Sequence, residues 1–242
     1  MRIATWNLNH GGRRGSAVTR QDAALRAVVA DLVVLTEPPI EWLTAGPGVV
    51  TSPAERESDR GGPEALEAWV AIVGDRVAPV GPPLPFERLA VRARAELDSE
   101  PVVIYGSVLP WGTAHKQAPR LAEPGETSLA MFERVLNAQL DDLLRLRRRF
   151  EGELLIWAGD FNQSLAGPNW GGSAEKRALL ADALARLDFD AWNKNEPHAR
   201  PGMCAIDLIC GPAGRHGHPV HRIDNLLDGR KLTDHAGYVV EV

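Results

Sequence analysis

Short apolar runs recur along this chain, separated by polar stretches that are rich in glycine and proline. The run at residues 154–158 is too short and too rich in strand-forming residues for a helix, so it predicts a buried strand. In residues 89–97, apolar and charged positions alternate, which indicates one solvated face and an antiparallel neighbour. The same patterns predict strands at residues 3–8, 32–35, 68–73, 89–97, 102–109, 154–158, 204–210 and 238–242.

Helical spacing of apolar residues occurs in three other segments. Thr19 is expected to cap a helix over residues 20–30, and a further helix is expected over residues 174–187. The longest covers residues 129–150, where one face carries Leu129, Phe132, Leu136, Leu140, Leu143 and Phe150. Its last turns hold four arginines, for which a solvated face at the helix C-terminus is favoured over nucleic-acid contact: Arg145, Arg147, Arg148 and Arg149.

Size and composition fit one globular domain over residues 1–242, and we expect a monomer. The net charge of −5 gives no indication of a strong attraction of the whole surface to nucleic acid or anionic lipid, and leaves local basic clusters open. No apolar run approaches the ~20 residues that span a bilayer, and no signal-peptide core follows Met1, so a cytoplasmic protein without a membrane span is expected. Cys204 and Cys210 fall in one predicted strand, about 20 Å apart if extended, and are expected to be reduced.

Polar side chains stand where several predicted strands end. Gly159 is expected to end the strand at residues 154–158, and Asp160 and Asn162 would then project to one side of an extended chain. Other strand ends carry Asn7, Glu37, Asp207, Asp234 and His235. Oxygen ligands of this kind suit Mg²⁺ or Mn²⁺ rather than zinc or copper. Each position alone also fits a turn or a solvated loop, so the prediction depends on the set.

A second histidine-containing segment offers an alternative metal site. His216, His218 and His221 lie close together in the sequence. Flanking glycine and proline residues, and the lack of suitably spaced cysteines or acids, favour an exposed loop over a zinc site.

Five motifs, in order along nearly the whole chain, resemble those of the endonuclease/exonuclease/phosphatase superfamily, which has the DNase I-like fold. Gly159-Asp160-Phe161-Asn162 matches the family's Gly-Asp-Phe-Asn. The other four are similar to its first-strand, Leu-Gln-Glu, Ile-Asp-Tyr-Ile and Ser-Asp-His motifs: Trp6-Asn7-Leu8-Asn9, Leu35-Thr36-Glu37, Ile206-Asp207-Leu208-Ile209 and Thr233-Asp234-His235.

This resemblance implies an α/β (α+β) fold, a two-sheet β-sandwich flanked by helices on both sides in four layers, and phosphoester hydrolysis assisted by Mg²⁺ or Mn²⁺. By the same likeness, Glu37 would ligate the metal, with Asn7 and Asp234 close to it. Asp160 would orient or deprotonate the attacking water, and Asn162 would hold that geometry. Asp207 would orient His235, which would hydrogen-bond the scissile phosphate.

Two positions depart from the family pattern. Val108 stands where the family usually has tyrosine or histidine on a central strand, and Thr36 replaces the glutamine beside the metal-binding glutamate. A phosphate contact supplied by His115 or Lys116 from the following loop would compensate for Val108. The residues expected to bind substrate are Asn9, Trp111, His115 and Lys116.

Three functions remain open from the sequence. The first is a nuclease or phosphodiesterase, in which Arg13, Arg14, Lys116 and Arg120 follow a nucleic-acid backbone and Trp111 or Trp170 stacks on a base. The second is a phosphatase or phosphodiesterase of a small phosphorylated metabolite or lipid headgroup, which the same centre can serve. The third, an inactive binding module, is disfavoured because the complete set of polar residues is present. Substrate choice is expected to lie in the loops at residues 40–67 and 111–126.

Overall fold

The computed structural model describes residues 1–9, 15–39, 48–53, 55–56, 66–81, 88–118, 121–215 and 218–242. Its first six-stranded sheet contains, in spatial order, β13 (Val220–Ile223), β16 (Gly237–Glu241), β1 (Arg2–Asn7), β2 (Leu32–Thr36), β6 (Val70–Gly74) and β3 (Val49–Thr51). The second contains β11 (Phe189–Ala191), β12 (Asp207–Pro212), β10 (Leu154–Asp160), β9 (Glu100–Val108), β8 (Ala90–Leu97) and β7 (Ala78–Pro79). Two small two-stranded sheets pair β4 (Glu55–Arg56) with β5 (Leu66–Glu67) and β14 (Leu226–Leu227) with β15 (Arg230–Lys231).

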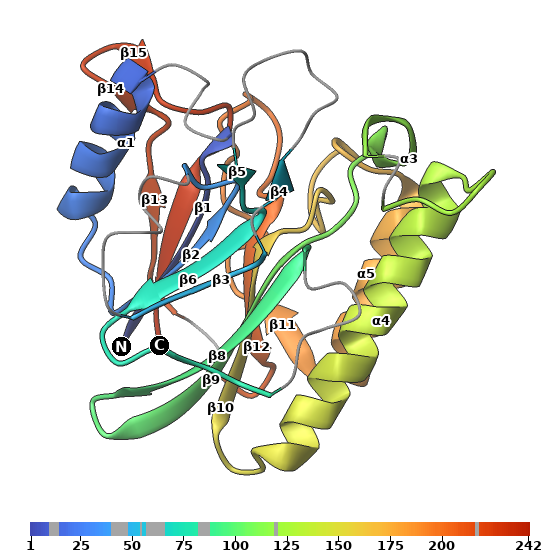
Figure 1. The fold of residues 1–242 in the computed structure, drawn as a ribbon, viewed down its shortest axis with the longest axis horizontal. Coiled ribbons are helices and arrows are strands. Elements are labelled where there is room, and N and C mark those ends of the chain that lie inside the picture. The colour runs from blue at the N-terminus through green and yellow to red at the C-terminus, as the bar shows by residue number, and fades with distance from the viewer. Residues whose placement is uncertain are drawn as a thin grey trace.

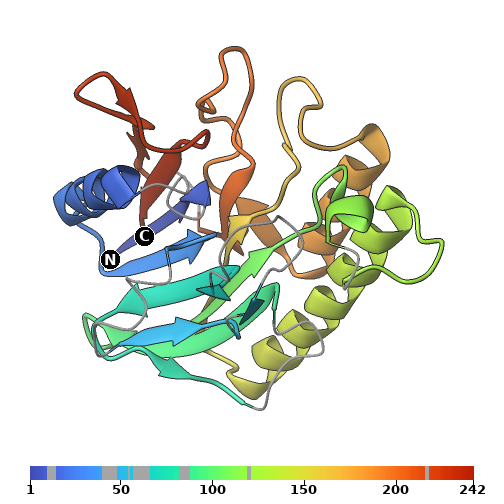
Figure 2. The same cartoon turned by 45° about the horizontal axis from the view of Figure 1, so that its top comes forward.

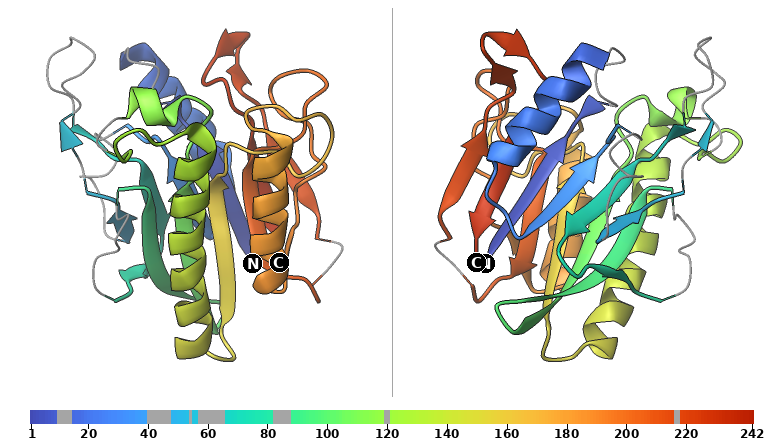
Figure 3. Two further views of the ribbon diagram at one scale, coloured as in Figure 1. Left: turned by 90° about the vertical axis from the view of Figure 1, so that its right-hand side faces the viewer. Right: turned by 60° about the vertical axis from the view of Figure 1, so that its left-hand side comes forward.

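The two sheets form the inner layers and helices form the outer layers (Figure 1). Figure 3 shows α1 (Gly15–Ala27) against the outer face of the first sheet, and α4 (Ser128–Arg149) with α5 (Ala174–Arg186) against the second. A further short helix, α3 (Ala114–Gln117), lies at the edge opposite both chain termini (Figures 1 and 2). The predicted α/β sandwich flanked by helices on both sides is therefore confirmed. No helix in the described part of the chain is long and apolar enough to cross a membrane.

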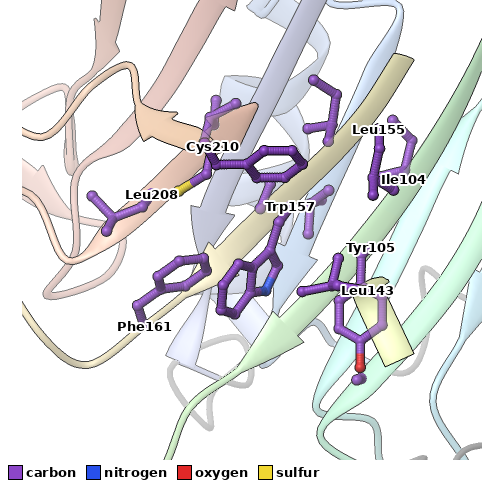
Figure 4. Packing of buried hydrophobic residues seen from close by; sticks show 14 of the residues in the cluster. Ile104, Tyr105, Leu143, Leu155, Trp157, Phe161, Leu208 and Cys210 are labelled. Carbon is purple, nitrogen blue, oxygen red and sulfur yellow. The ribbon is translucent and has the colours of Figure 1, made fainter. Parts of the chain in front are cut away.

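Large aromatic side chains fill the space around the central strands of the second sheet (Figure 4). Trp157 and Phe161 are both fully buried, and their ring centroids lie 4.6 Å apart. The indole Nε1 of Trp157 donates to Ser107 Oγ at 2.8 Å, which satisfies the one polar group that this side chain buries. This packing fixes β10 against β9, and so fixes the end of β10 that carries Asp160.

Gly159 lies inside β10, so the expectation that it ends the strand was wrong. Its φ is +141°, and a Cβ at this position would overlap the backbone carbonyl of Ser107 on the neighbouring strand. The glycine therefore allows a close approach of two backbones, as glycine in a strand interior often does. The strand continues through it to Asp160.

Gly159→Ala is expected to destabilise the protein by about 3 kcal/mol or more, because backbone strain and overpacking add at this position. The free energy of unfolding from urea denaturation measures the effect. Gly125→Ala is the matched control, since Gly125 also has a positive φ, of +77°, but nothing lies within 4 Å of the added methyl group. The control is expected to cost about 1–2 kcal/mol. Equal losses in the two variants would contradict the role assigned to the close strand approach.

The predicted helices are present, with two corrections. The first begins at Gly15 rather than Arg20, so Thr19 lies inside α1 and does not cap it. In α4 the predicted face is buried from Phe132 to Leu143, but Leu129 is 38% exposed. The cap of α4 is Thr127, whose side chain accepts a hydrogen bond from the Ala130 N–H at 3.2 Å.

The arginines near the end of α4 make local contacts within the protein. Arg147 donates to the backbone carbonyl of Leu187, Arg145 donates to the carbonyl of Asp141, and the Arg149 guanidinium lies over the Phe150 ring. All four arginines are exposed, as predicted for a solvated face at the end of this helix.

Both cysteines are free, as expected. They do not share a strand, because β12 begins at Asp207 and Cys204 instead forms an isolated bridge with Pro197.

Two polar segments of the sequence are described only in part. His218 packs on Trp192, and His221 pairs with Glu241, so these two histidines have different partners; His216 lies outside the described residues. Of the predicted excursion at residues 40–67, the described pieces form β3, β4 and β5, and the rest also lies outside the described residues.

Candidate functional site

The strand register brings polar strand ends from both sheets to one edge. In the first sheet β1 and β2 are parallel, with Asn7 beside Thr36. Asn7 and Glu37, which comes directly after Thr36, therefore lie at the same end of neighbouring strands. In the second sheet β10 and β12 are antiparallel, and Asp160 is the register partner of Asp207. These positions are separated widely in sequence, and only the sheet topology brings them together.

Asn7 connects the two sheets through its side-chain amide. Its Nδ2 donates to Asp160 Oδ2 at 2.9 Å and to Glu37 Oε1 at 3.2 Å. Its Oδ1 accepts from the backbone N–H of Asn9 at 2.8 Å. One amide therefore orients two carboxylates and is itself fixed by the turn that follows β1.

Asp160 and Asn162 are held by a tight turn rather than by an extended chain, which corrects the expectation that they project side by side from a strand. Asn162 has a φ of +49°, and its backbone N–H donates to Asp160 Oδ1 at 2.8 Å. Its side-chain Nδ2 donates to the carbonyl of Leu109 at 2.9 Å. Both oxygens of Asp160 thus accept a hydrogen bond, and Asn162 ties the turn to the loop after β9.

Asp207 and the partly buried His235 form a pair, as the sequence predicted. Asp207 Oδ2 lies 2.7 Å from His235 Nδ1, and Asp207 is fully buried. The backbone of Asp207 is fixed by Asn193, whose side chain accepts from the Ile209 N–H and donates to the Asp207 carbonyl. With Nδ1 engaged, Nε2 is the ring nitrogen of His235 that remains for a substrate.

The segment that carries Asp234 is joined to the end of β1. Thr233 Oγ1 donates to the carbonyl of Asn7 at 2.9 Å, and Asn9 Nδ2 donates to Asp234 Oδ1 at 3.2 Å. Gln21 of α1 adds a second connection, because its Nε2 donates to the carbonyls of Leu8 and Leu232. The C-terminal motif is therefore held in register with the N-terminal one.

A cavity of about 310 Å³ opens between these groups. It is lined by Asn9, Glu37, Trp69, Trp111, Gln117, Asp160, Asn162, Trp170, Gly171, Ile206, Asp234 and His235. The cavity thus joins five of the seven predicted catalytic and metal-binding residues, and the other two, Asn7 and Asp207, lie directly behind it through their hydrogen bonds.

Tryptophan side chains supply the apolar part of the cavity wall. Trp69 and Trp111 stack with their centroids 5.3 Å apart, and Trp111 Nε1 donates to Gln117 Oε1 at 2.6 Å. Trp170 is a further lining residue, and the Arg200 guanidinium lies 4.8 Å from its ring centroid. The carboxylates and the imidazole are therefore accompanied by flat aromatic surfaces.

The electrostatics of the cavity are dominated by carboxylates that are close together and poorly solvated. Burial and the neighbouring Asp207 raise the pKa of Asp160 to about 7. Burial also raises the pKa of Glu37, although His235 opposes that shift. Burial disfavours the charged form of His235, but the charge and hydrogen bond of Asp207 outweigh it and raise the pKa of His235 to about 10. At neutral pH the imidazole is a cation among acids.

The remaining predicted substrate-binding positions are placed differently from one another. Asn9 and Trp111 line the cavity, whereas His115 and Lys116 are not among the described residues that line it. Val108 is the register partner of Asp160 and is fully buried. Its apolar side chain supplies no phosphate contact or acid at this position. Arg13, Arg14 and Arg120 lie outside the described residues.

Sequence reasoning missed several residues of this region: Trp69, Gln117, Asn193 and His198. Trp69 falls just before β6 and resembles an ordinary strand residue, and Gln117 carries no distinctive signal. Asn193 and His198 precede the Asp207 motif in an irregular segment, so only tertiary contacts reveal their position.

No protein-family model matches this sequence, and no curated protein matches it. Solved structures do resemble it. The 3'-5' exonuclease NExo from Neisseria meningitidis has 20% identity and a TM-score of 0.65, over 100% of this chain and 99% of that one. The AP endonuclease LMAP from Leishmania major has 14% identity and a TM-score of 0.63, over 99% of this chain and 86% of that one. The endonuclease domain of TRAS1, a telomere-specific non-LTR retrotransposon, has 16% identity and a TM-score of 0.59, over 99% of this chain and 96% of that one. The chain therefore shares the fold of these solved structures, which is the DNase I-like fold that its motifs predicted.

Proposed function

We propose that this protein is a divalent-metal-dependent phosphodiesterase that cleaves nucleic acid. The observation that carries the proposal is the single cavity that brings Glu37, Asp160, Asp234 and His235 together from both sheets. This combination of acids and one cationic imidazole matches the needs of phosphoester hydrolysis, namely a site for a hard cation, a base for water and a donor for phosphoryl oxygen.

The donor set fits Mg²⁺ or Mn²⁺. Carboxylate oxygens predominate, and hard cations prefer oxygen ligands. The pKa of Glu37 is raised because its carboxylate is poorly solvated, and a bound cation would stabilise the charged form of that carboxylate. Glu37 would ligate the ion, with Asn7 and Asp234 close to it. When bound, the ion would neutralise the charge of the phosphoryl oxygens.

Each of the other groups has a task that its contacts support. Asp160 accepts hydrogen bonds from Asn7 and Asn162, which orient its carboxylate so that it can hold and deprotonate a water. His235, fixed by Asp207 at Nδ1, donates from Nε2 to a phosphoryl oxygen. The donor is already charged at neutral pH, so it can stabilise the negative charge that grows during attack.

The aromatic surfaces favour nucleic acid over a small phosphorylated metabolite. Tryptophan rings stack on nucleobases irrespective of their sequence, and each stacked base contributes about 1–3 kcal/mol. Trp111 and Trp170 line the same cavity as the acids. A structural neighbour, the 3' phosphatase NExo, was solved bound to product DNA hairpin. An overall charge of −5 favours a limited contact, such as a single strand, an end or a nick.

A substrate panel tests the proposal. Single-stranded DNA, duplex DNA, RNA and phosphorylated metabolites are compared, together with bis(p-nitrophenyl) phosphate and its monoester. We expect hydrolysis of the diester and of at least one nucleic acid, loss of activity with EDTA, and recovery with Mg²⁺ or Mn²⁺. Preference for the monoester and metabolites would favour a small-molecule phosphatase, and inertness with every substrate and metal would indicate a binding module.

Mg²⁺ affinity is expected to weaken as the pH falls through about 7. Above that value Asp160 is ionised and adds negative charge beside Glu37, whereas below it a proton on Asp160 removes that charge and competes with the cation. Calorimetric titration with Mg²⁺ at about pH 6 and about pH 8, one unit on each side of the pKa of Asp160, measures the change. Equal affinity at both values, without proton release on binding, would contradict the placement of Asp160 as an ionisable neighbour of the metal ligand Glu37.

A further inference from the structure

His198 lies beside the Asp207–His235 pair, in a position that the proposed chemistry does not use. It is only 4% exposed, and its ring meets the His235 ring at a steep angle, with centroids 5.4 Å apart. The Trp170 ring also packs edge to face against His198, with centroids 5.0 Å apart. The segment before it is anchored by Tyr238, whose hydroxyl donates to the carbonyl of Pro197 at 3.1 Å. The ring is therefore held in place on several sides.

The contacts of His198 determine which ring nitrogen carries the proton. The backbone N–H of Arg200 donates to Nδ1 at 3.0 Å, so Nδ1 must present its lone pair. Burial lowers the pKa of His198 to about 4, and the ring is therefore neutral at neutral pH. A neutral imidazole has one N–H group, so Nε2 of His198 is a hydrogen-bond donor.

Two buried polar atoms near the catalytic pair need a partner. Nε2 of His198 and Oδ1 of Asp207 are both buried and make no hydrogen bond with the described residues. One is a donor and the other an acceptor. A ring nitrogen of His198 and a carboxylate oxygen of Asp207 lie within 4.8 Å of each other. That separation suits a bond formed by a small ring movement or through one bridging water.

We propose that His198 is a positioning residue for Asp207: its Nε2–H donates to Asp207 Oδ1, directly or through one water. Asp207 would then be held at both oxygens, by His198 at one and by His235 at the other. A carboxylate fixed in this way cannot rotate, so His235 keeps the orientation that directs Nε2 to the phosphate. This inference rests on the proposed phosphodiesterase function only for its effect on turnover.

The same three side chains also have the spacing of a metal cluster. Coordination by Nε2 of His198 would require the lone pair on that nitrogen and the proton on Nδ1. The Arg200 N–H already points at Nδ1, where a second proton would clash with it. Asp207 Oδ2 is likewise engaged by His235. The hydrogen-bond arrangement therefore fits the donor role better than a second metal site.

Nitrogen-15 NMR of the histidine rings in the wild-type protein tests the tautomer without any need for turnover. We expect His198 with its proton on Nε2 and no change in its ring shifts on addition of Zn²⁺. A proton on Nδ1, or a shift that reports Zn²⁺ coordination, would overturn the inference. An inactive protein with the expected tautomer would count against the proposed function but not against this hydrogen bond.

Kinetics of two variants test the effect on His235. His198→Phe keeps a ring of similar size but removes the donor, and we expect kcat for bis(p-nitrophenyl) phosphate to fall about 10–100-fold with KM little changed. His198→Gln supplies an N–H donor again and is expected to recover most of the loss. His221→Phe, an exposed histidine paired with Glu241, is the matched control and should keep wild-type kcat. Equal activity of His198→Phe and the wild type, or no recovery in a folded His198→Gln variant, would refute the positioning role.

Discussion

Asp160→Asn is expected to lower kcat for phosphodiester hydrolysis by about 10²–10⁴-fold, the range typical of a lost general base. Asparagine has nearly the same shape but cannot take a proton from water. It also disturbs the turn, because both oxygens of Asp160 accept hydrogen bonds, from Asn7 and from Asn162. An amide offers only one acceptor, so one of these bonds is lost.

The control for this variant is Asp190→Asn. Asp190 is a half-buried acid that accepts from Lys194 at 2.6 Å, on β11 and away from the cavity. Its substitution should leave kcat unchanged. Steady-state kinetics over a range of Mg²⁺ concentrations distinguishes the roles of Asp160. A variant that regains full kcat at high Mg²⁺ would show that Asp160 is a metal ligand rather than the base.

His235→Ala is expected to reduce turnover by a similar factor, about 10²–10⁴-fold. Two effects combine. The cationic donor to the phosphoryl oxygen is lost, and the buried Asp207 carboxylate loses the partner that lies 2.7 Å from it. Because the pKa of His235 is raised to about 10, the donor role should persist across neutral pH in the wild-type protein.

Kinetics of His235→Ala and His221→Ala, combined with thermal unfolding, measure this effect. His221 is the comparison because it is also paired with an acid, Glu241, but is exposed. We expect a large loss of kcat in the first variant and none in the second. Wild-type turnover in a folded His235→Ala variant would remove His235 from the mechanism.

Much of the fold could be predicted from the sequence because its strands are strongly patterned. The run at residues 154–158 is apolar at every position and forms a central strand whose side chains are buried on both faces. Residues 129–150 have helical spacing and form α4 almost to the residue. The order of five short motifs then indicated the topology, and the cavity brings three of the predicted acids and the imidazole together.

What the sequence could not show depends on contacts between distant backbones and side chains. Gly159 has the appearance of a turn residue, but the neighbouring strand approaches so closely that only glycine fits inside β10. Trp69 reaches the cavity through its stack with Trp111, across a long separation in sequence. The proton position on His198 follows from one backbone N–H, that of Arg200, and no local pattern records it.

The most direct test of the central claim is an anomalous diffraction measurement on crystals grown with Mn²⁺. We predict one strong peak in the cavity, at the carboxylate of Glu37 and close to Asn7 and Asp234. A peak between His198, Asp207 and His235 with none at Glu37, or no peak under conditions that support hydrolysis, would contradict a metal centre built at the junction of the two sheets.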